Sequence, residues 1–215
     1  MKIIDDKKIA VQELKRISTR TNSENNNVIN ADVDEILKEV KTYGDRAVEK
    51  YTIKFDGFNP NPMQVSTNDL KDAWDEIDSN LKRSLETAYK RIKKFHEKEI
   101  PLSFTIKGDH GDTMQRRWRP VKNAGIYIPG GRAAYPSTVL MNAIPAKVAG
   151  VEEVIMVSPG NTEGKINKTV LAAAHLSEIN KVFRIGGAQA IGALAFGTDQ
   201  INKVDVISGP GNIYV

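Results

Sequence analysis

The 215-residue sequence has no cysteine, which excludes disulfides, a thiol nucleophile and cysteine-based metal sites within this chain. Its three histidines, His96, His110 and His175, fall in separate predicted elements without the spacing of a zinc motif. The N-terminus lacks the apolar region of a secretory signal, and no uncharged apolar run is long enough to span a membrane. These absences predict a cytoplasmic chain that has no metal ligands of its own and no membrane partner.

Charge of neither sign dominates, with 31 basic and 27 acidic residues interspersed to a net charge of +4. The densest cations lie on a predicted helix over 79–98, where acidic residues interrupt them and no aromatic residues interleave to stack bases. A second cluster, Arg116, Arg117 and Arg119 beside Trp118, is divided between two faces by strand alternation. The charge pattern therefore favours a solvated surface and no nucleic acid, and RNA binding is the weaker alternative.

Residues 1–120 are charged and mostly helical in pattern. Apolar spacing predicts helices that begin at an Asn30 cap, at Asp45 after Gly44, at residue 66 or 67, and at about residue 79. The asparagines at 25–27 are expected in a loop and residues 55–60 in a turn. Three acidic residues suit the first turn of the first helix, where they favour its N-terminus: Asp32, Asp34 and Glu35. Two short strands, 103–107 and 113–118, are predicted with a turn at 108–111 between them.

Residues 121–215 are apolar and punctuated by glycine, and they alternate predicted strands with predicted helices. The strands are expected at 124–128, 153–157, 181–185 and 204–207, and the helices at 137–149, 166–176 and 188–196. Pro145 is expected to bend or interrupt the first of these helices. This alternation predicts an α/β fold with a Rossmann-like parallel sheet at 121–215, preceded by a mainly helical α+β N-terminal part at 1–120 that belongs to an incomplete first domain.

Glycine-containing loops follow all four predicted strands, at 129–131, 158–161, 186–187 and 209–212. In a parallel sheet these loops share one edge, where backbone N–H groups and helix N-termini can bind phosphate. Three side chains near the loops could orient a nucleotide: Tyr127, Gln189 and Asn212. Neither G-x-G-x-x-G nor a P-loop occurs, so the residues alone leave open whether the glycines serve a ligand or only tight turns and helix caps.

Five runs, 126–131, 135–141, 143–151, 184–191 and 209–215, resemble the histidinol dehydrogenase family, as do shorter stretches at 51–52, 54–57 and 95–97. The resemblance implies an aldehyde-dehydrogenase-like fold with two Rossmann-like domains and an intertwined homodimer. It implies NAD- and zinc-dependent oxidation of L-histidinol to L-histidine through an aldehyde, the last step of histidine biosynthesis. It also places Tyr127, Gln189 and Asn212 at NAD-contacting positions.

The acid–base residues and zinc ligands of that family match no position here, so no catalytic residue and no metal ligand is expected in this chain. We therefore expect the N-terminal half of the enzyme, truncated at the C-terminus, with an unfinished helix after 209–212. Such a half is expected to be inactive alone, and poorly soluble or partly molten because apolar faces stay uncovered. The alternative function is a non-catalytic module that binds a nucleotide or a partner protein.

Overall fold

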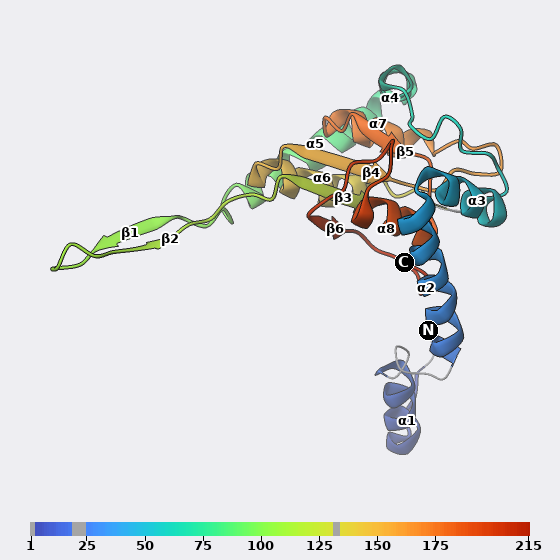
Figure 1. Ribbon diagram of the computed structural model, residues 1–215, viewed down its shortest axis with the longest axis horizontal. Helices are drawn as coiled ribbons and strands as arrows, with labels where there is room; N and C mark the ends of the chain where they lie inside the picture. Colours follow the sequence, from blue (N-terminus) through green and yellow to red (C-terminus); the bar gives the residue numbers. More distant parts are fainter. Residues whose placement is uncertain (1–2, 19–24, 131–133) are drawn as a thin grey trace.

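A central parallel sheet organises the chain in the computed structural model, which describes residues 3–18, 25–130 and 134–215 (Figure 1). Its strand order is β5-β4-β3-β6, and every neighbouring pair is parallel. The strands are β3 (Asn123–Tyr127), β4 (Glu153–Val157), β5 (Lys181–Phe183) and β6 (Val206–Ser208). The predicted α/β fold with a Rossmann-like parallel sheet is confirmed.

Helices cover both faces of this sheet, because successive side chains of a strand point to opposite faces. In β3, Ile126 belongs to the core under α6 (Pro136–Ala149) and α7 (Lys168–Leu176), whereas Tyr127 belongs to the core under α8 (Gly187–Phe196). Both side chains are almost fully buried. The near-continuous apolar sequence of the strands thus reflects burial on two sides.

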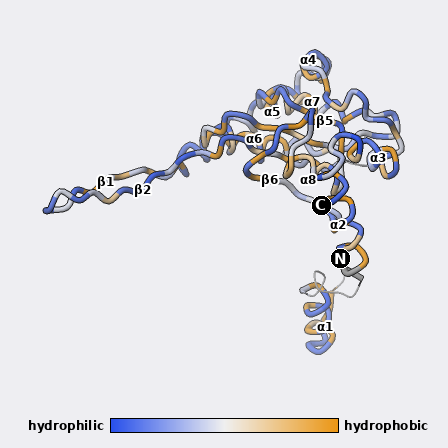
Figure 2. The backbone as a smooth tube through the Cα atoms, in the orientation of Figure 1, coloured by the Kyte–Doolittle hydropathy of each residue, from blue (hydrophilic) through white to orange (hydrophobic). Residues whose placement is uncertain are grey.

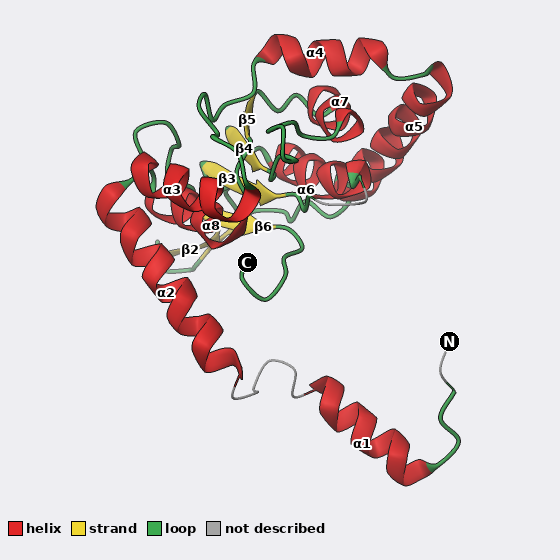
Figure 3. Cartoon of the chain, turned by 90° about the vertical axis from the view of Figure 1, so that its right-hand side faces the viewer, coloured by secondary structure: helices red, strands yellow, loops and turns green. Residues whose placement is uncertain are grey.

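The helices of the first 120 residues complete both layers (Figure 3). On one face, α2 (Asn25–Tyr43) and α3 (Asp45–Asp56) pack on α8. On the other, α4 (Thr67–Glu76) packs on α7, and α5 (Ser79–His96) packs on α6. The domain boundary at residue 120 stays a prediction. None of the described helices is long and apolar enough to cross a membrane.

The outer edge of β5 is covered by residues 63–65. Gln64 forms an antiparallel bridge with Phe183, and the Val65 N–H donates to the Val182 carbonyl at 2.8 Å. The Arg184 N–H in turn donates to the Met63 carbonyl at 3.0 Å. This short segment satisfies backbone groups that an edge strand otherwise leaves unpaired.

Two peripheral elements project from the body (Figure 1). β1 (Phe104–Lys107) and β2 (Thr113–Arg116) form a separate antiparallel ribbon in which every residue is exposed. The helix α1 (Lys7–Ser18) also buries none of its residues. Figure 2 shows hydrophobic stretches along both elements, away from the sheet. The ribbon matches the two predicted strands, and His110 lies in their turn as expected.

The start of α2 departs from the sequence prediction. The helix begins at Asn25, so residues 25–27 are helical and not a loop, and Asn30 is not its cap. The first-turn interpretation of Asp32, Asp34 and Glu35 is therefore wrong. Asparagine is a weak helix former, but packing of the Ile36–Val40 face on α8 outweighs local propensity.

Three other local predictions need correction. The helix α3 continues through Phe55 and Asp56 and ends at Gly57, whose left-handed backbone (φ 77°) lets its N–H donate to the Ile53 carbonyl. The helix α6 runs to Ala149 with Pro145 inside it, so the expected interruption is absent, whereas a bend at Pro145 stays a prediction. No helix starts at residues 209–212, and the Val215 N–H instead closes a turn by donating to the Asn212 carbonyl.

Candidate functional site

All four loops that follow the strands of the sheet contribute to one cavity of about 800 Å³ at its carboxyl edge. This volume is within the range of small-molecule sites. We call it the rim cavity, and its lining residues are Asp32, Glu35, Ile36, Tyr51, Lys54, Phe55, Asp56, Tyr127, Pro129, Gly130, Pro159, Gly187, Ala188, Gln189, Pro210, Gly211, Asn212 and Tyr214. The expected shared edge is confirmed, although Gly131 of the first loop lies outside the described residues.

Glycine allows these loops to approach one another closely. A Cβ on Gly209, whose φ is 141°, would lie 2.2 Å from the Tyr127 carbonyl oxygen. A Cβ on Gly130 or Gly186 would lie 2.5 or 2.6 Å from the Pro159 ring. At these positions, therefore, glycine is required by tight packing of the loops, and the packed loops form the wall of the cavity.

Tyr127 connects the end of β3 to the start of α8. Its side chain is almost fully buried, and its hydroxyl accepts a hydrogen bond from the Gly187 N–H at 3.2 Å. Burial raises the pKa of Tyr127, and the nearby Asp56 carboxyl raises it further, while the Gly187 hydrogen bond opposes both. The phenol is therefore neutral at physiological pH, and its proton can be donated.

Gln189 and Asn212 line this cavity together with Tyr127, but they differ in burial and in hydrogen bonding. Gln189 is 1% exposed, and its Oε1 is buried without a hydrogen-bond partner. An unpaired buried acceptor costs about 1–3 kcal/mol, which a ligand that supplies a donor would recover. Asn212 is exposed, and its Oδ1 accepts the Tyr214 N–H at 2.9 Å. The structure thus brings all three predicted residues together, with one orphaned acceptor among them.

Part of the cavity wall comes from helices that the sequence interpretation had not connected with the site. The helices α2 and α3 supply Asp32, Glu35, Ile36, Tyr51, Lys54, Phe55 and Asp56. Helical spacing does place Asp32 and Glu35 on one face of α2. That spacing alone could not show which element the face would meet, because the packing of α2 on α8 decides it.

Asp56 is the most perturbed carboxyl in the cavity wall. Burial raises its pKa from 3.8 to about 6, and its Oδ2 is buried without a hydrogen-bond partner. It is also the last residue of α3, where the negative end of the helix dipole disfavours a carboxylate. The fold therefore holds this group at a position that opposes its charged form.

Comparison with known proteins identifies the family. The family model for histidinol dehydrogenase matches residues 19–215. The chain belongs to the histidinol dehydrogenase family. It is 86% identical over 215 residues to histidinol dehydrogenase of Prochlorococcus marinus (strain MIT 9312), covering 100% of this chain and 49% of that protein. It is 53% identical over 185 residues to histidinol dehydrogenase of Aquifex aeolicus (strain VF5), covering 85% and 42%.

A solved histidinol dehydrogenase structure agrees with the fold. The crystal structure from Elizabethkingia anophelis superposes with a TM-score of 0.82 at 37% identity, covering 86% of this chain and 43% of that one. This chain thus spans about half the length of the curated histidinol dehydrogenases that it matches. The sequence-based resemblance to the family is confirmed.

The histidines of this family member lie apart. His96 pairs with Glu99 through Nδ1 and Oε2 at 2.5 Å, and the His175 ring lies 6.3 Å from the Trp74 ring. Trp74 and Tyr89 are partly buried and pack against the apolar core beneath α6 and α7. Within the part of the chain that the structure describes, no group of three or more acidic or histidine side chains is arranged to hold a metal ion.

Proposed function

We propose that this chain forms the NAD-contacting part of a histidinol dehydrogenase that oxidises L-histidinol to L-histidine through an aldehyde. The observation that carries the proposal is the convergence of four loops and three predicted side chains, Tyr127, Gln189 and Asn212, on one cavity. The choice of L-histidinol as substrate follows from the relatives, which are named histidinol dehydrogenases. When bound, NAD supplies the hydride acceptor for the two oxidation steps.

Each residue has a role that its geometry supports. The Tyr127 hydroxyl already accepts a hydrogen bond from the Gly187 N–H, which fixes the start of α8 beside it. Its O–H donates a hydrogen bond to the nucleotide. The unpaired Gln189 Oε1 accepts a hydrogen bond from a donor of the nucleotide. Asn212 holds the last turn in place and offers its side-chain amide N–H at the rim. The N-terminus of α8 and the glycine loops favour the phosphates.

The described residues do not fit a zinc site. We propose that the zinc implied by the family, and the acid–base residues, belong to a part of the enzyme outside these 215 residues. A cytoplasmic homodimer is part of the same proposal.

Nucleotide titration tests the cavity. Gln189→Met keeps the side-chain volume and removes the amide, so we expect it to weaken NAD binding about tenfold in calorimetry. Tyr127→Phe should weaken binding by about threefold to tenfold for the loss of one hydroxyl. The matched control is Tyr89→Phe, which alters a partly buried tyrosine outside the cavity.

Reduction of NAD on addition of L-histidinol is measured in parallel, on the protein as expressed from its own gene. NAD binding that is unchanged in the Gln189 and Tyr127 variants contradicts the proposal. NAD binding without histidinol oxidation supports the alternative of a non-catalytic nucleotide-binding module.

A further inference from the structure

The helical wall of the rim cavity carries an excess of carboxyl groups. Asp32 and Glu35 from α2 and Asp56 from α3 line it. Among the lining residues that the structure describes, Lys54 is the one cation, and its Nζ lies over the Phe55 ring at 5.2 Å from the centroid. This wall therefore offers hydrogen-bond acceptors to a ligand in the cavity.

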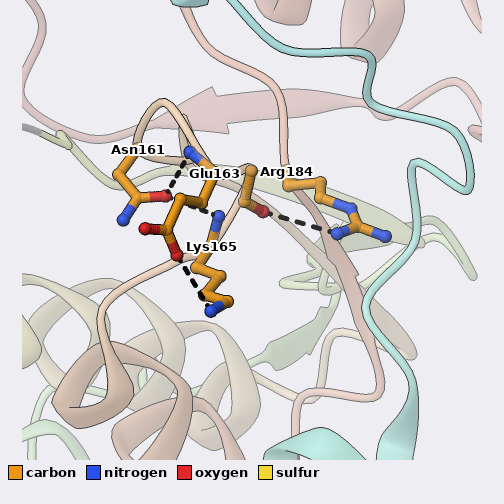
Figure 4. Close-up of polar contacts among 5 residues, drawn as sticks. Asn161, Glu163, Lys165 and Arg184 are labelled. Atoms are coloured by element: carbon orange, nitrogen blue, oxygen red, sulfur yellow. Dashed lines mark hydrogen bonds and ion pairs between the residues drawn. The ribbon is translucent and has the colours of Figure 1, made fainter.

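The loop after β4 contributes no carboxyl group to the cavity. In Rossmann folds an acidic residue near this part of the sheet often accepts a hydrogen bond from the ribose 2′-hydroxyl. Here the loop folds on itself (Figure 4): Asn161 Oδ1 accepts the N–H groups of Glu163 and Lys165, and the Lys165 ammonium pairs with the Glu163 carboxylate at 2.9 Å. Glu163 is thus engaged within its own loop.

The arginine beside that loop, Arg184, also forms hydrogen bonds away from the rim cavity. Arg184 donates from Nε to the Pro62 carbonyl at 2.8 Å. A terminal nitrogen of Arg184 donates to the Gly164 carbonyl at 3.4 Å (Figure 4). Arg184 lines a separate, smaller pocket with Lys165. The rim cavity consequently lacks an arginine among its described lining residues, the side chain best suited to bind an additional phosphate.

Asp56 differs from the other two carboxyl groups. Asp32 and Glu35 are exposed on α2, whereas Asp56 is half-buried between α3 and Tyr127, and its Oδ2 is unpaired. Its position at the C-terminus of α3 adds nothing to helix stability. A buried, unpartnered acceptor in a cavity wall is explained by a ligand that brings a donor to it.

We propose that Asp56 selects the nucleotide: its carboxylate accepts hydrogen bonds from a ribose diol in the rim cavity and repels a ribose that carries a 2′-phosphate. The inference rests on the proposed function and assigns the preference for NAD over NADP to one residue. Asp56 binds the ribose and takes no part in proton transfer.

Asp56→Asn tests the assignment, because it keeps the side-chain shape and removes the negative charge. NAD and NADP are each titrated by calorimetry into the protein as its gene encodes it. The unaltered protein should prefer NAD by at least about tenfold, and Asp56→Asn should lower that preference by about tenfold. Asp56→Glu keeps the charge and should retain a preference for NAD with weaker binding.

Two matched variants separate a direct contact from general charge. Glu35→Gln removes a charge from the same cavity wall at an exposed position, and Glu86→Gln removes one from α5. Both should keep the NAD preference within about threefold of the unaltered protein, since exposed charges are screened. Circular dichroism confirms that each variant is folded.

An unchanged preference in Asp56→Asn overturns the assignment, and so does an equal loss of preference in Glu35→Gln. Binding of NAD that Gln189→Met weakens, together with an unaffected NAD preference in Asp56→Asn, leaves the proposed function standing and removes only this inference. If neither nucleotide binds the unaltered protein, both fail together.

Discussion

Strand β3 of the central sheet and strand β1 of the ribbon have opposite surroundings. From Ala124 to Tyr127, β3 is buried, whereas all of β1 is exposed and Phe104 and Ile106 each keep 51% of their surface accessible. Both strands are paired, β3 on two sides and β1 on one, so the presence of a hydrogen-bonded partner does not by itself bury a strand. The helices do, because they cover the sheet and leave the ribbon bare. The candidate site occurs where helices follow strands.

The largest difference in unfolding free energy between the two regions should result from truncating an apolar side chain in each. Ile155→Ala in β4 removes a fully buried side chain and should lower the free energy of unfolding by about 3–4 kcal/mol. Ile106→Ala in β1 should change it by less than about 0.5 kcal/mol. Urea unfolding followed by circular dichroism measures both. An equal loss in the two variants would show that the ribbon is buried against a partner in solution.

A glycine pair gives the next largest contrast. Gly209→Ala places a Cβ 2.2 Å from the Tyr127 carbonyl oxygen and should destabilise the fold by about 2 kcal/mol or more. Gly111→Ala, in the turn of the ribbon, has a φ of 83° and no atom within 4 Å, so only backbone strain of about 1 kcal/mol is expected. Thermal unfolding compares them, and equal losses would contradict the tight packing of the rim.

Asp56 predicts a pH-dependent contrast between buried and exposed carboxyl groups. Because folding raises its pKa from 3.8 to about 6, the folded state is favoured at low pH and loses this advantage as pH rises through 6. Asp56→Asn should therefore match the unaltered protein at pH 4 and exceed it above pH 6 by about 1 kcal/mol, allowing for solvent screening.

Asp109→Asn, in the exposed ribbon turn, is the control for this pH series. Because Asp109 is exposed, its substitution should change the melting temperature by less than Asp56→Asn does above pH 6. The measurement is the melting temperature at each pH. A difference for Asp56→Asn that does not grow with pH would show that the carboxyl is solvated in the folded state.

The smallest effect concerns a contact on the ribbon itself. The Arg116 guanidinium lies 4.7 Å from the centre of the Trp118 ring, an exposed cation–π pair. Arg116→Gln should reduce the free energy of unfolding by no more than about 0.5–1 kcal/mol. Chemical unfolding checks this value, and a larger loss would mean that the ribbon is more than a locally paired element.

The sheet could be predicted because its signals are local. Glycine loops interrupt apolar runs of strand length, and this alternation predicted four strands and their shared edge. Tyr127, Gln189 and Asn212 followed from that edge together with the family resemblance, and the structure gathers them in one cavity.

The helical wall could not be predicted in the same way. Asp56 falls in a stretch that looks like a turn, and only packing extends α3 through it to Gly57. The start of α2 likewise depends on its contact with α8. Local propensity carries no information about such distant partners, so both the carboxyl groups and their position at the cavity were missed.

The two outer edges of the sheet differ in whether their backbone groups are already paired. Residues 63–65 cap the β5 side with backbone hydrogen bonds. Among the described residues, β6 has a hydrogen-bonded neighbour only on its β3 side, and Val206 is 45% exposed there. A further strand could therefore pair beside β6 without displacing residues 63–65. Residues 63–65 thus occupy the β5 edge, whereas the outer edge of β6 has no paired strand among the described residues.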